Sequence, residues 1–257
     1  MIALLEPIFK GEWAPLAETL ICAPTPPVGA VLVAQLLREP GLLDTLIRHH
    51  ARRLGAVGQD LRPAASAWSL AYLDVLLPPM VAAASVLQHR FPAHAECISV
   101  LLSDDGAPLG FHIGDTGSAL SGTDTATRFD PLIRGHLEPL FAAISRQTRL
   151  AGKILWGNAA RRLEGIFEQA LQFTGNATDI AQDRDHLLLN HLWSGGCANR
   201  LYGKQRVVIS ADNGHSPAPL KLHRQCCLYY LLPDEGFCGA CPLAPQHHKL
   251  RGAEPPA

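Results

Sequence analysis

Four of the chain's seven cysteines lie close together near its C-terminus. Cys226 and Cys227 are adjacent, and after ten further residues Cys238 and Cys241 follow with Gly and Ala between them. Clustered cysteines of this kind can hold a zinc ion, carry an iron-sulfur cluster or form disulfides. A free cysteine is usually buried as a small hydrophobic residue, but four in so short a segment indicate a shared role.

The start of the chain bears on the disulfide interpretation. It contains no basic segment that leads into an apolar stretch and a small-residue cleavage site, so we expect no secretory signal. Structural disulfides are rare in reducing compartments. We therefore expect a cytoplasmic protein whose cysteines are not paired in disulfides.

The spacing of the cysteines favours an iron-sulfur cluster over a zinc site but leaves both open. Cys238 and Cys241 have the two-residue spacing typical of zinc sites, but all-cysteine zinc sites usually combine two such pairs. Adjacent side chains on an extended backbone point to opposite faces, so Cys226 and Cys227 need a turn-like or helical backbone to reach one site. A two-iron cluster is broader than one ion and tolerates this divergence better. A zinc-stabilised, non-enzymatic protein that binds a partner remains the alternative.

The residues around the cysteines carry a family resemblance. The segment resembles the C-terminal signature of FhuF-type ferric siderophore reductases, Cys-Cys, ten residues, then Cys-x-x-Cys. The matching positions also include Arg224, Leu228, Tyr230, Leu232, Pro233, Gly239, Pro242 and Leu243. Weaker resemblances lie upstream, at Leu155-Trp156-Gly157-Asn158-Ala159, at Leu201-Tyr202 and at Arg206-Val207-Val208.

The resemblance implies an oxidoreductase with a 2Fe-2S cluster on Cys226, Cys227, Cys238 and Cys241. The implied reaction is one-electron reduction of siderophore-bound Fe(III) to Fe(II), with release of iron in the cytoplasm. It requires a ferric siderophore and an electron donor that the sequence does not identify, and no catalytic residue beyond the cluster.

Arg224 is a candidate for a residue that lies next to such a cluster without being a ligand. Four thiolates outweigh the positive charge of a two-iron core, so nearby cations would raise the reduction potential. His223 and Arg224 are close enough in sequence to act in this way, although a solvated basic pair would look the same; the resemblance favours Arg224. Cys22, Cys97 and Cys197 are expected to be buried thiols and not ligands.

A second candidate feature is a concentration of positive charge around the Trp-Gly-Asn element. It is typical of a solvated helix face, but it could also receive an anionic iron chelate or an acidic electron donor. The residues concerned are Arg146, Arg149, Lys153, Arg161 and Arg162.

The elements that must position these residues indicate a predominantly helical α+β fold with a small antiparallel sheet. We expect a mainly helical body over residues 1–195, with a β-hairpin near 97–113, and a strand plus the cysteine-rich module over residues 196–257. The helical patterns cover 28–54 in two pieces around Pro40-Gly41, 64–88 with a break at Pro78-Pro79, a long helix opened by Asp130-Pro131, 150–173 and 178–193. A strand is expected at 205–210.

Composition excludes some classes of function. The net charge is −1 and the basic residues are scattered, so the sequence carries no signature of nucleic-acid binding. The most apolar stretch, from Ala67 to Leu87, contains Asp74 and Pro78-Pro79, which argue against a transmembrane helix. Peripheral membrane association stays open.

Overall fold

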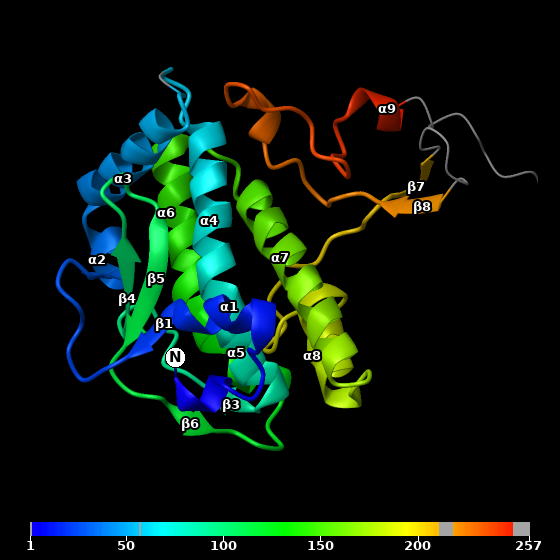
Figure 1. The fold of residues 1–257 in the computed structure, drawn as a ribbon. Helices are drawn as coiled ribbons and strands as arrows, with labels where there is room; N and C mark the ends of the chain where they lie inside the picture. The colour runs from blue at the N-terminus through cyan, green and yellow to red at the C-terminus, as the bar shows by residue number, and fades with distance from the viewer. Residues whose placement is uncertain (1, 57, 211–217, 249–257) are drawn as a thin grey trace, which may run out of the picture.

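The computed structural model describes residues 2–56, 58–210 and 218–248. Figure 1 shows helices packed around α4 (Arg62–Val81), with a small sheet on one side and α7 (Gly152–Phe173) on the other. The predicted α+β, predominantly helical fold class is therefore confirmed. The N-terminal segment adds the 3-10 turns η1 (Ala3–Leu5) and η2 (Gly11–Trp13) and the short helix α1 (Ala14–Glu18).

The larger sheet has the strand order β1-β5-β4-β2. Its centre is the predicted hairpin, formed by β4 (Ile98–Leu102) and the antiparallel β5 (Pro108–Ile113). Two strands that were not predicted extend it: β1 (Leu20–Cys22), which runs parallel to β5, and β2 (Val31–Leu32). Each is too short to show a period in the sequence. Strands β3 (His89–Arg90) and β6 (Ser118–Ala119) form a separate antiparallel pair.

The two predicted helices around Pro40 are α2 (Val33–Arg38) and α3 (Pro40–Arg53). The predicted break at Pro78-Pro79 is wrong, because α4 continues through both prolines to Val81 and into the π-helix η3 (Ala82–Val86). A proline at position 79 cannot donate to the carbonyl of Val75. The Thr19 hydroxyl donates to that carbonyl instead, at 2.9 Å.

The start predicted at Asp130-Pro131 is also wrong. Helix α5 (Thr125–Leu132) begins earlier, where Asp124 accepts a hydrogen bond from the Thr127 amide at 2.7 Å and caps the helix. Pro131 lies inside α5, which continues into the π-helix η4 (Ile133–Leu137) and α6 (Glu138–Thr148).

The predicted helix at 150–173 is α7, and the following helix, α8 (Thr178–Leu188), ends five residues earlier than predicted. Trp193, which was expected to lie at the end of that helix, instead packs into the core, and its ring N–H donates to Asp130 at 3.0 Å. The intervening segment is held by Asn199, whose side-chain amide donates to the carbonyls of Leu187 and Asn190, both at 2.9 Å.

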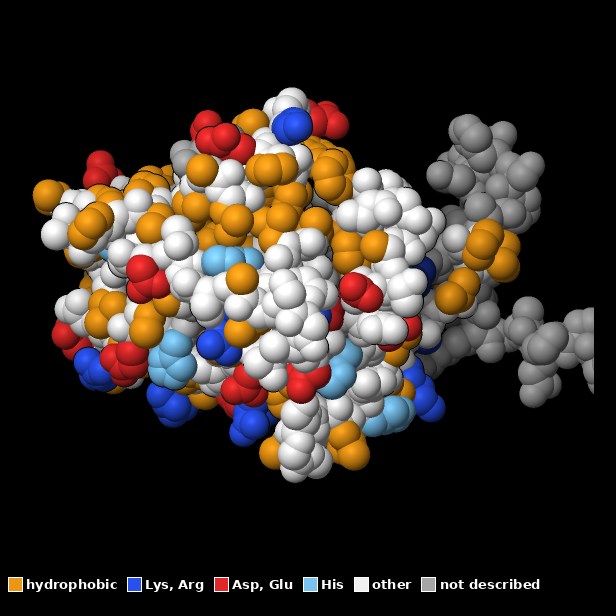
Figure 2. Space-filling view, turned by 90° about the horizontal axis from the view of Figure 1, so that it is seen from below, with side chains coloured by type: hydrophobic (Ala, Val, Ile, Leu, Met, Phe, Trp, Pro, Cys, Tyr) orange, Lys and Arg blue, Asp and Glu red, His pale blue; other side chains and the backbone are white. Residues whose placement is uncertain are grey.

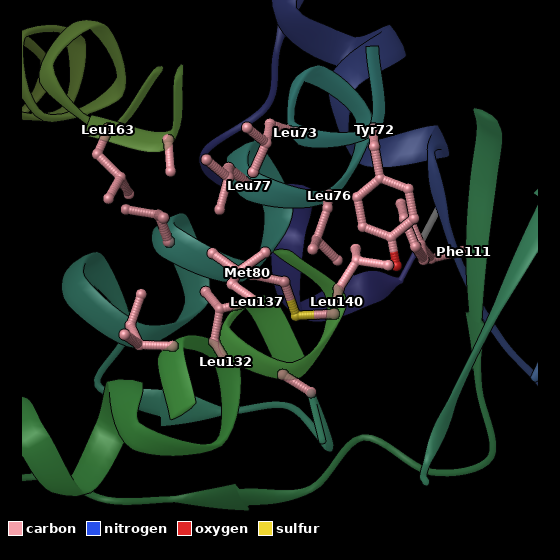
Figure 3. Close-up of a cluster of buried hydrophobic side chains, with 14 of the residues drawn as sticks. Tyr72, Leu73, Leu76, Leu77, Met80, Phe111, Leu132, Leu137, Leu140 and Leu163 are labelled. Carbon is pink, nitrogen blue, oxygen red and sulfur yellow. The ribbon is translucent and has the colours of Figure 1, made fainter. Parts of the chain in front are cut away.

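The core lies on both sides of α4. Figure 3 shows side chains of α4, from Tyr72 to Met80, between Phe111 of β5 and leucines of the helices that follow. Helix α4 is apolar on nearly all faces, as expected for a helix that is surrounded by other elements.

The segment Arg62–Val86 is long and apolar enough to cross a membrane by length and composition alone. However, 72% of its most apolar window is buried inside the protein, as in the central helix of a protein core. On the face shown in Figure 2, acidic and basic side chains are interspersed.

The C-terminal part lies beside α7 and the N-terminal end of α4 (Figure 1). It contains the antiparallel strands β7 (Val207–Ser210) and β8 (Ala218–Lys221), the 3-10 turn η5 (Tyr229–Leu231) and α9 (Pro245–His248). The strand predicted at 205–210 is thus present. Residues 211–217 and 249–257 of the predicted C-terminal region lie outside the described residues.

Candidate metal centre

The adjacent cysteines lie on a turn-like backbone. The chain bends at Arg224 and Gln225, and Leu228, the residue after the pair, is in the left-handed region with φ 62°. Its amide is 3.4 Å from the sulfur of Cys226 and donates to it. Cys226 and Cys227 are 8% and 4% exposed, so neither side chain is directed to solvent.

The second pair lies in a tight turn, in which the Cys241 amide donates to the Cys238 carbonyl at 2.9 Å. Two contacts hold the turn against its neighbours. The His223 amide donates to the carbonyl of Ala240 at 2.9 Å, and the buried His247 ring donates through Nε2 to the carbonyl of Gly239 at 3.0 Å.

These two segments bring Cys226, Cys238 and Cys241 together, and Cys227 is close enough to affect the pKa values of Cys226 and Cys238. The sulfurs of Cys241 and Cys226 are 3.5 Å apart, and both residues pack with Cys238 and Ala244 in one small apolar cluster. Burial, with a smaller contribution from the neighbouring thiols that include Cys227, raises the pKa of Cys226 to about 12 and that of Cys238 to about 11. Without a metal these thiols are protonated, so metal binding must release protons and weakens in acid.

The donor set fits an iron-sulfur cluster. Four thiols and no carboxylate form the group, and soft thiolates are the ligands that bind such clusters. Within the described residues, no three Cys, His, Asp or Glu side chains are arranged to hold a single metal ion. The fit therefore rests on the type and convergence of the donors.

Arg224 is directed toward the helical body. Its guanidinium donates to Glu164 of α7 at 2.8 Å and to the carbonyl of Leu201, and its side chain is only 7% exposed. Glu164 also accepts from the Gln205 side-chain amide at 2.9 Å. Arg224 therefore attaches the cysteine segment to α7, and its charge is largely neutralised there.

The Trp-Gly-Asn element of α7 makes three different contacts. The ring of Trp156 packs edge-on against Phe141 at 5.0 Å between centroids, and the Asn158 amide donates to the hydroxyls of Ser66 and Ser69 of α4, both at 3.0 Å. A Cβ on Gly157 would lie 2.8 Å from Cβ of Gln225. One turn of α7 thus joins α6, α4 and the residue before Cys226.

The remaining cysteines differ from the prediction. Cys97 and Cys197 are exposed and Cys22 is half-buried, so the expectation of three buried thiols is wrong. Cys97 lies in the turn before β4, and Cys197 lies in the irregular segment after α8. None of the three belongs to the group of four thiols.

The five basic residues have different surroundings. Arg162 is paired with Asp74 at 2.7 Å. Arg161 is close enough to Cys238 and His223 to lower the pKa of each, although burial is the larger effect for both: it raises the pKa of Cys238, and it lowers that of His223 to about 4. Lys153 lines a cleft beside Gln225. Arg146 and Arg149 lie in the last turn and at the C-terminal end of α6.

Three contributors to the site were missed or misjudged from the sequence. Glu164 has no local signal, because its partner Arg224 is sixty positions away. Gly157 interrupts a strong helical pattern, and such a glycine indicates close packing, a signal that could have been used. His247 is one of two adjacent histidines near the end of the sequence with no spaced partner, a pattern typical of a solvated tail, but it is 5% exposed.

Comparison with known protein families identifies the chain. The family described as "Ferric iron reductase FhuF-like transporter" matches residues 66–206, more than half of the chain, and the "FhuF 2Fe-2S C-terminal domain" matches residues 224–243. The chain belongs to the FhuF family. Its cofactor is a 2Fe-2S cluster, as the C-terminal match indicates, and this match disfavours the structural-zinc alternative.

No curated protein matches this FhuF-family chain. Among solved structures, ATP-bound aerobactin synthetase IucA from a hypervirulent pathotype of Klebsiella pneumoniae is 18% identical with a TM-score of 0.55, over 68% of this chain and 37% of that one. Another IucA structure from the same source is 16% identical with a TM-score of 0.60, over 78% and 48%. The chain spans less than half the length of these synthetases, and the likeness shows the fold alone.

Proposed function

We propose that this protein is a ferric siderophore reductase that delivers one electron to siderophore-bound Fe(III) and so releases iron as Fe(II) in the cytoplasm. The match of the FhuF 2Fe-2S domain to residues 224–243 carries this proposal. The packing of Cys226, Cys238 and Cys241 against one another within that segment supports it.

The roles of the residues follow from their contacts. We propose Cys226, Cys227, Cys238 and Cys241 as the four ligands. When bound, the cluster supplies reversible one-electron chemistry. The oxygen donors of a siderophore are hard ligands that hold Fe(III) more strongly than Fe(II), so reduction weakens the chelate.

The position of the module suits electron transfer at a surface. Cys238 is half-buried, whereas Cys226, Cys227 and Cys241 are buried. The module lies outside the helical core (Figure 1), so a chelate need not enter the core to approach it. We propose that residues 1–195 form the body and residues 196–257 the cluster-carrying part. All seven cysteines are free thiols, which is compatible with a reducing cytoplasm.

An anaerobic titration tests the function. The reconstituted protein is reduced, freed of excess reductant and mixed with ferric catecholate, hydroxamate or carboxylate siderophores, while a ferrous-specific chelator is present. For at least one chelate we expect the oxidised visible spectrum to return with about one Fe(II) formed per reduced cluster. The matching gallium(III) complexes, which cannot accept the electron, serve as the control. A cluster that all the ferric chelates leave reduced would refute the proposal.

A further inference from the structure

A cleft lies where the start of α7 meets the segment before the cysteines. We call it the junction cleft and define it by Lys153, Trp156, Arg200, Tyr202, Arg224 and Gln225, which line it. Its volume is about 330 Å³, at the lower end of the range of small-molecule sites. Gln225, at one wall, is bonded directly to Cys226.

The charge at the mouth of this cleft is positive. Lys153 is exposed and forms no ion pair with the residues that the structure describes. Arg200 pairs with Glu138 at 3.3 Å, but the arginine side chain is 59% exposed and that of Glu138 is 37% exposed, so the pair is weak and leaves the arginine available. Arg224 at the back is neutralised by Glu164. Two accessible cations therefore face an entering ligand.

The walls of the junction cleft are flat and ordered by their neighbours. The Tyr202 ring packs on His191 with 3.8 Å between centroids, and Trp156 is fixed against Phe141. Three of the lining positions, Gly152, Gly157 and Gly203, have no side chain. Aromatic walls with a few charged groups suit a compact organic chelate, whereas a protein electron donor would need a broader surface.

We infer that the junction cleft binds the ferric chelate, and that it selects chelates of net negative charge through Lys153 and Arg200. This inference rests on the proposed function, because it names the substrate site and class of the same reductase. The bound metal complex would lie beside Gln225, next to the first cysteine, and only an electron passes to its Fe(III). The two cations also offset the repulsion between an anionic chelate and the thiolates.

Binding is tested apart from electron transfer. The oxidised holoprotein is titrated calorimetrically at low salt with the trianionic gallium(III) complex of a tris-catecholate and with the neutral gallium(III) complex of a tris-hydroxamate. We expect Lys153→Glu and Arg200→Glu each to weaken binding of the trianion by roughly tenfold, with a smaller loss at high salt. Neither should alter the cluster spectrum.

Arg146→Glu is the matched control, since it makes the same charge change in α6 on an exposed residue outside the cleft. Equal affinity of wild type, Lys153→Glu and Arg200→Glu for the trianion would overturn the inference, as would binding of the neutral complex in preference to it. Failure of the proposed function looks different, because the wild-type cluster would then reduce no ferric chelate at all. Loss of affinity in Arg146→Glu equal to that in Lys153→Glu would point to general charge attraction and would also overturn the cleft assignment.

Discussion

Leu228 belongs to the turn that positions the two adjacent cysteines. Neighbouring side chains on an extended chain diverge, and the structure places a bend before the pair and a left-handed residue after it. A non-glycine residue in that region costs about 1 kcal/mol. The strain is maintained because the same turn buries both thiols and directs the Leu228 amide at Cys226.

The prediction at the scale of single residues concerns the four proposed cluster ligands. Replacing Cys226, Cys227, Cys238 or Cys241 by Ser should abolish or severely disturb the cluster, because a hydroxyl is a hard and poor substitute for a thiolate. The visible spectrum and the content of iron and acid-labile sulfide, about two of each per chain in the wild type, measure this.

Cys22→Ser is the control, since Cys22 lies outside the group of four thiols. It should keep the wild-type spectrum. Wild-type spectra in all four ligand variants would show that these thiols do not hold the cluster. Stoichiometric zinc without sulfide in protein produced with ample iron would contradict the 2Fe-2S assignment.

Helix α7 is the element that connects the body to the cysteine segment. Within one turn, Trp156, Gly157 and Asn158 contact α6, Gln225 and α4, and Glu164 farther along the helix pairs with Arg224. The position of the thiols relative to the body is therefore set mainly by packing against α7, together with the contact of η5 with α4.

Two glycines of α7 give a matched prediction for this element. Alanine is the better helix former by about 1 kcal/mol, so Gly165→Ala, where the added Cβ meets nothing within 4 Å, should stabilise the protein slightly. Gly157→Ala should destabilise it by about 1 to 3 kcal/mol, because the Cβ would overlap Cβ and Cγ of Gln225. Denaturant unfolding of the two variants measures both signs; stabilisation by Gly157→Ala would mean that Gln225 does not lie against α7.

Comparison of the expected and observed elements shows which features of the fold could be predicted from the sequence. The cysteine signature, the hairpin at 97–113 and α7 depend on local spacing and period, and they are readable for that reason. Within α4, the Val75 carbonyl that Pro79 cannot serve accepts from the hydroxyl of Thr19, 56 positions away. The Arg224–Glu164 pair joins residues 60 positions apart. Contacts of this kind have no local signature, so the attachment of the cysteine segment to α7 could not be predicted.

At the scale of the whole molecule, a buried polar pair lies inside the core around α4. Tyr72 and His136 are both buried, with the hydroxyl 2.6 Å from Nε2. Nδ1 of His136 is 2.8 Å from the Ala93 carbonyl, which can only accept. Nδ1 therefore carries the proton, and Nε2 accepts from Tyr72. A neutral ring satisfies both contacts, whereas a second proton on Nε2 would face the hydroxyl in an apolar core.

This arrangement predicts how acid affects the stability of the fold. Burial lowers the pKa of His136 from 6.5 to about 4. Below pH 6.5 the unfolded chain takes up a proton on this residue, while the folded chain does not until about pH 4, so the free energy of unfolding falls as the pH falls through that window. The full loss is about 3 kcal/mol, of which about 2 kcal/mol lies between about pH 7 and pH 5. His50, whose pKa burial also lowers to about 4, acts in the same direction.

Denaturant unfolding of wild type and His136→Gln at these two pH values isolates the contribution. The variant should be less stable than wild type near pH 7, because it disturbs two buried hydrogen bonds, yet it should lose about 2 kcal/mol less on acidification. Acid release of the cluster acts on both proteins alike, so it cancels in the comparison. An equal loss in wild type and His136→Gln would mean that His136 is protonated in the folded protein at about pH 5, which the Tyr72 and Ala93 contacts oppose.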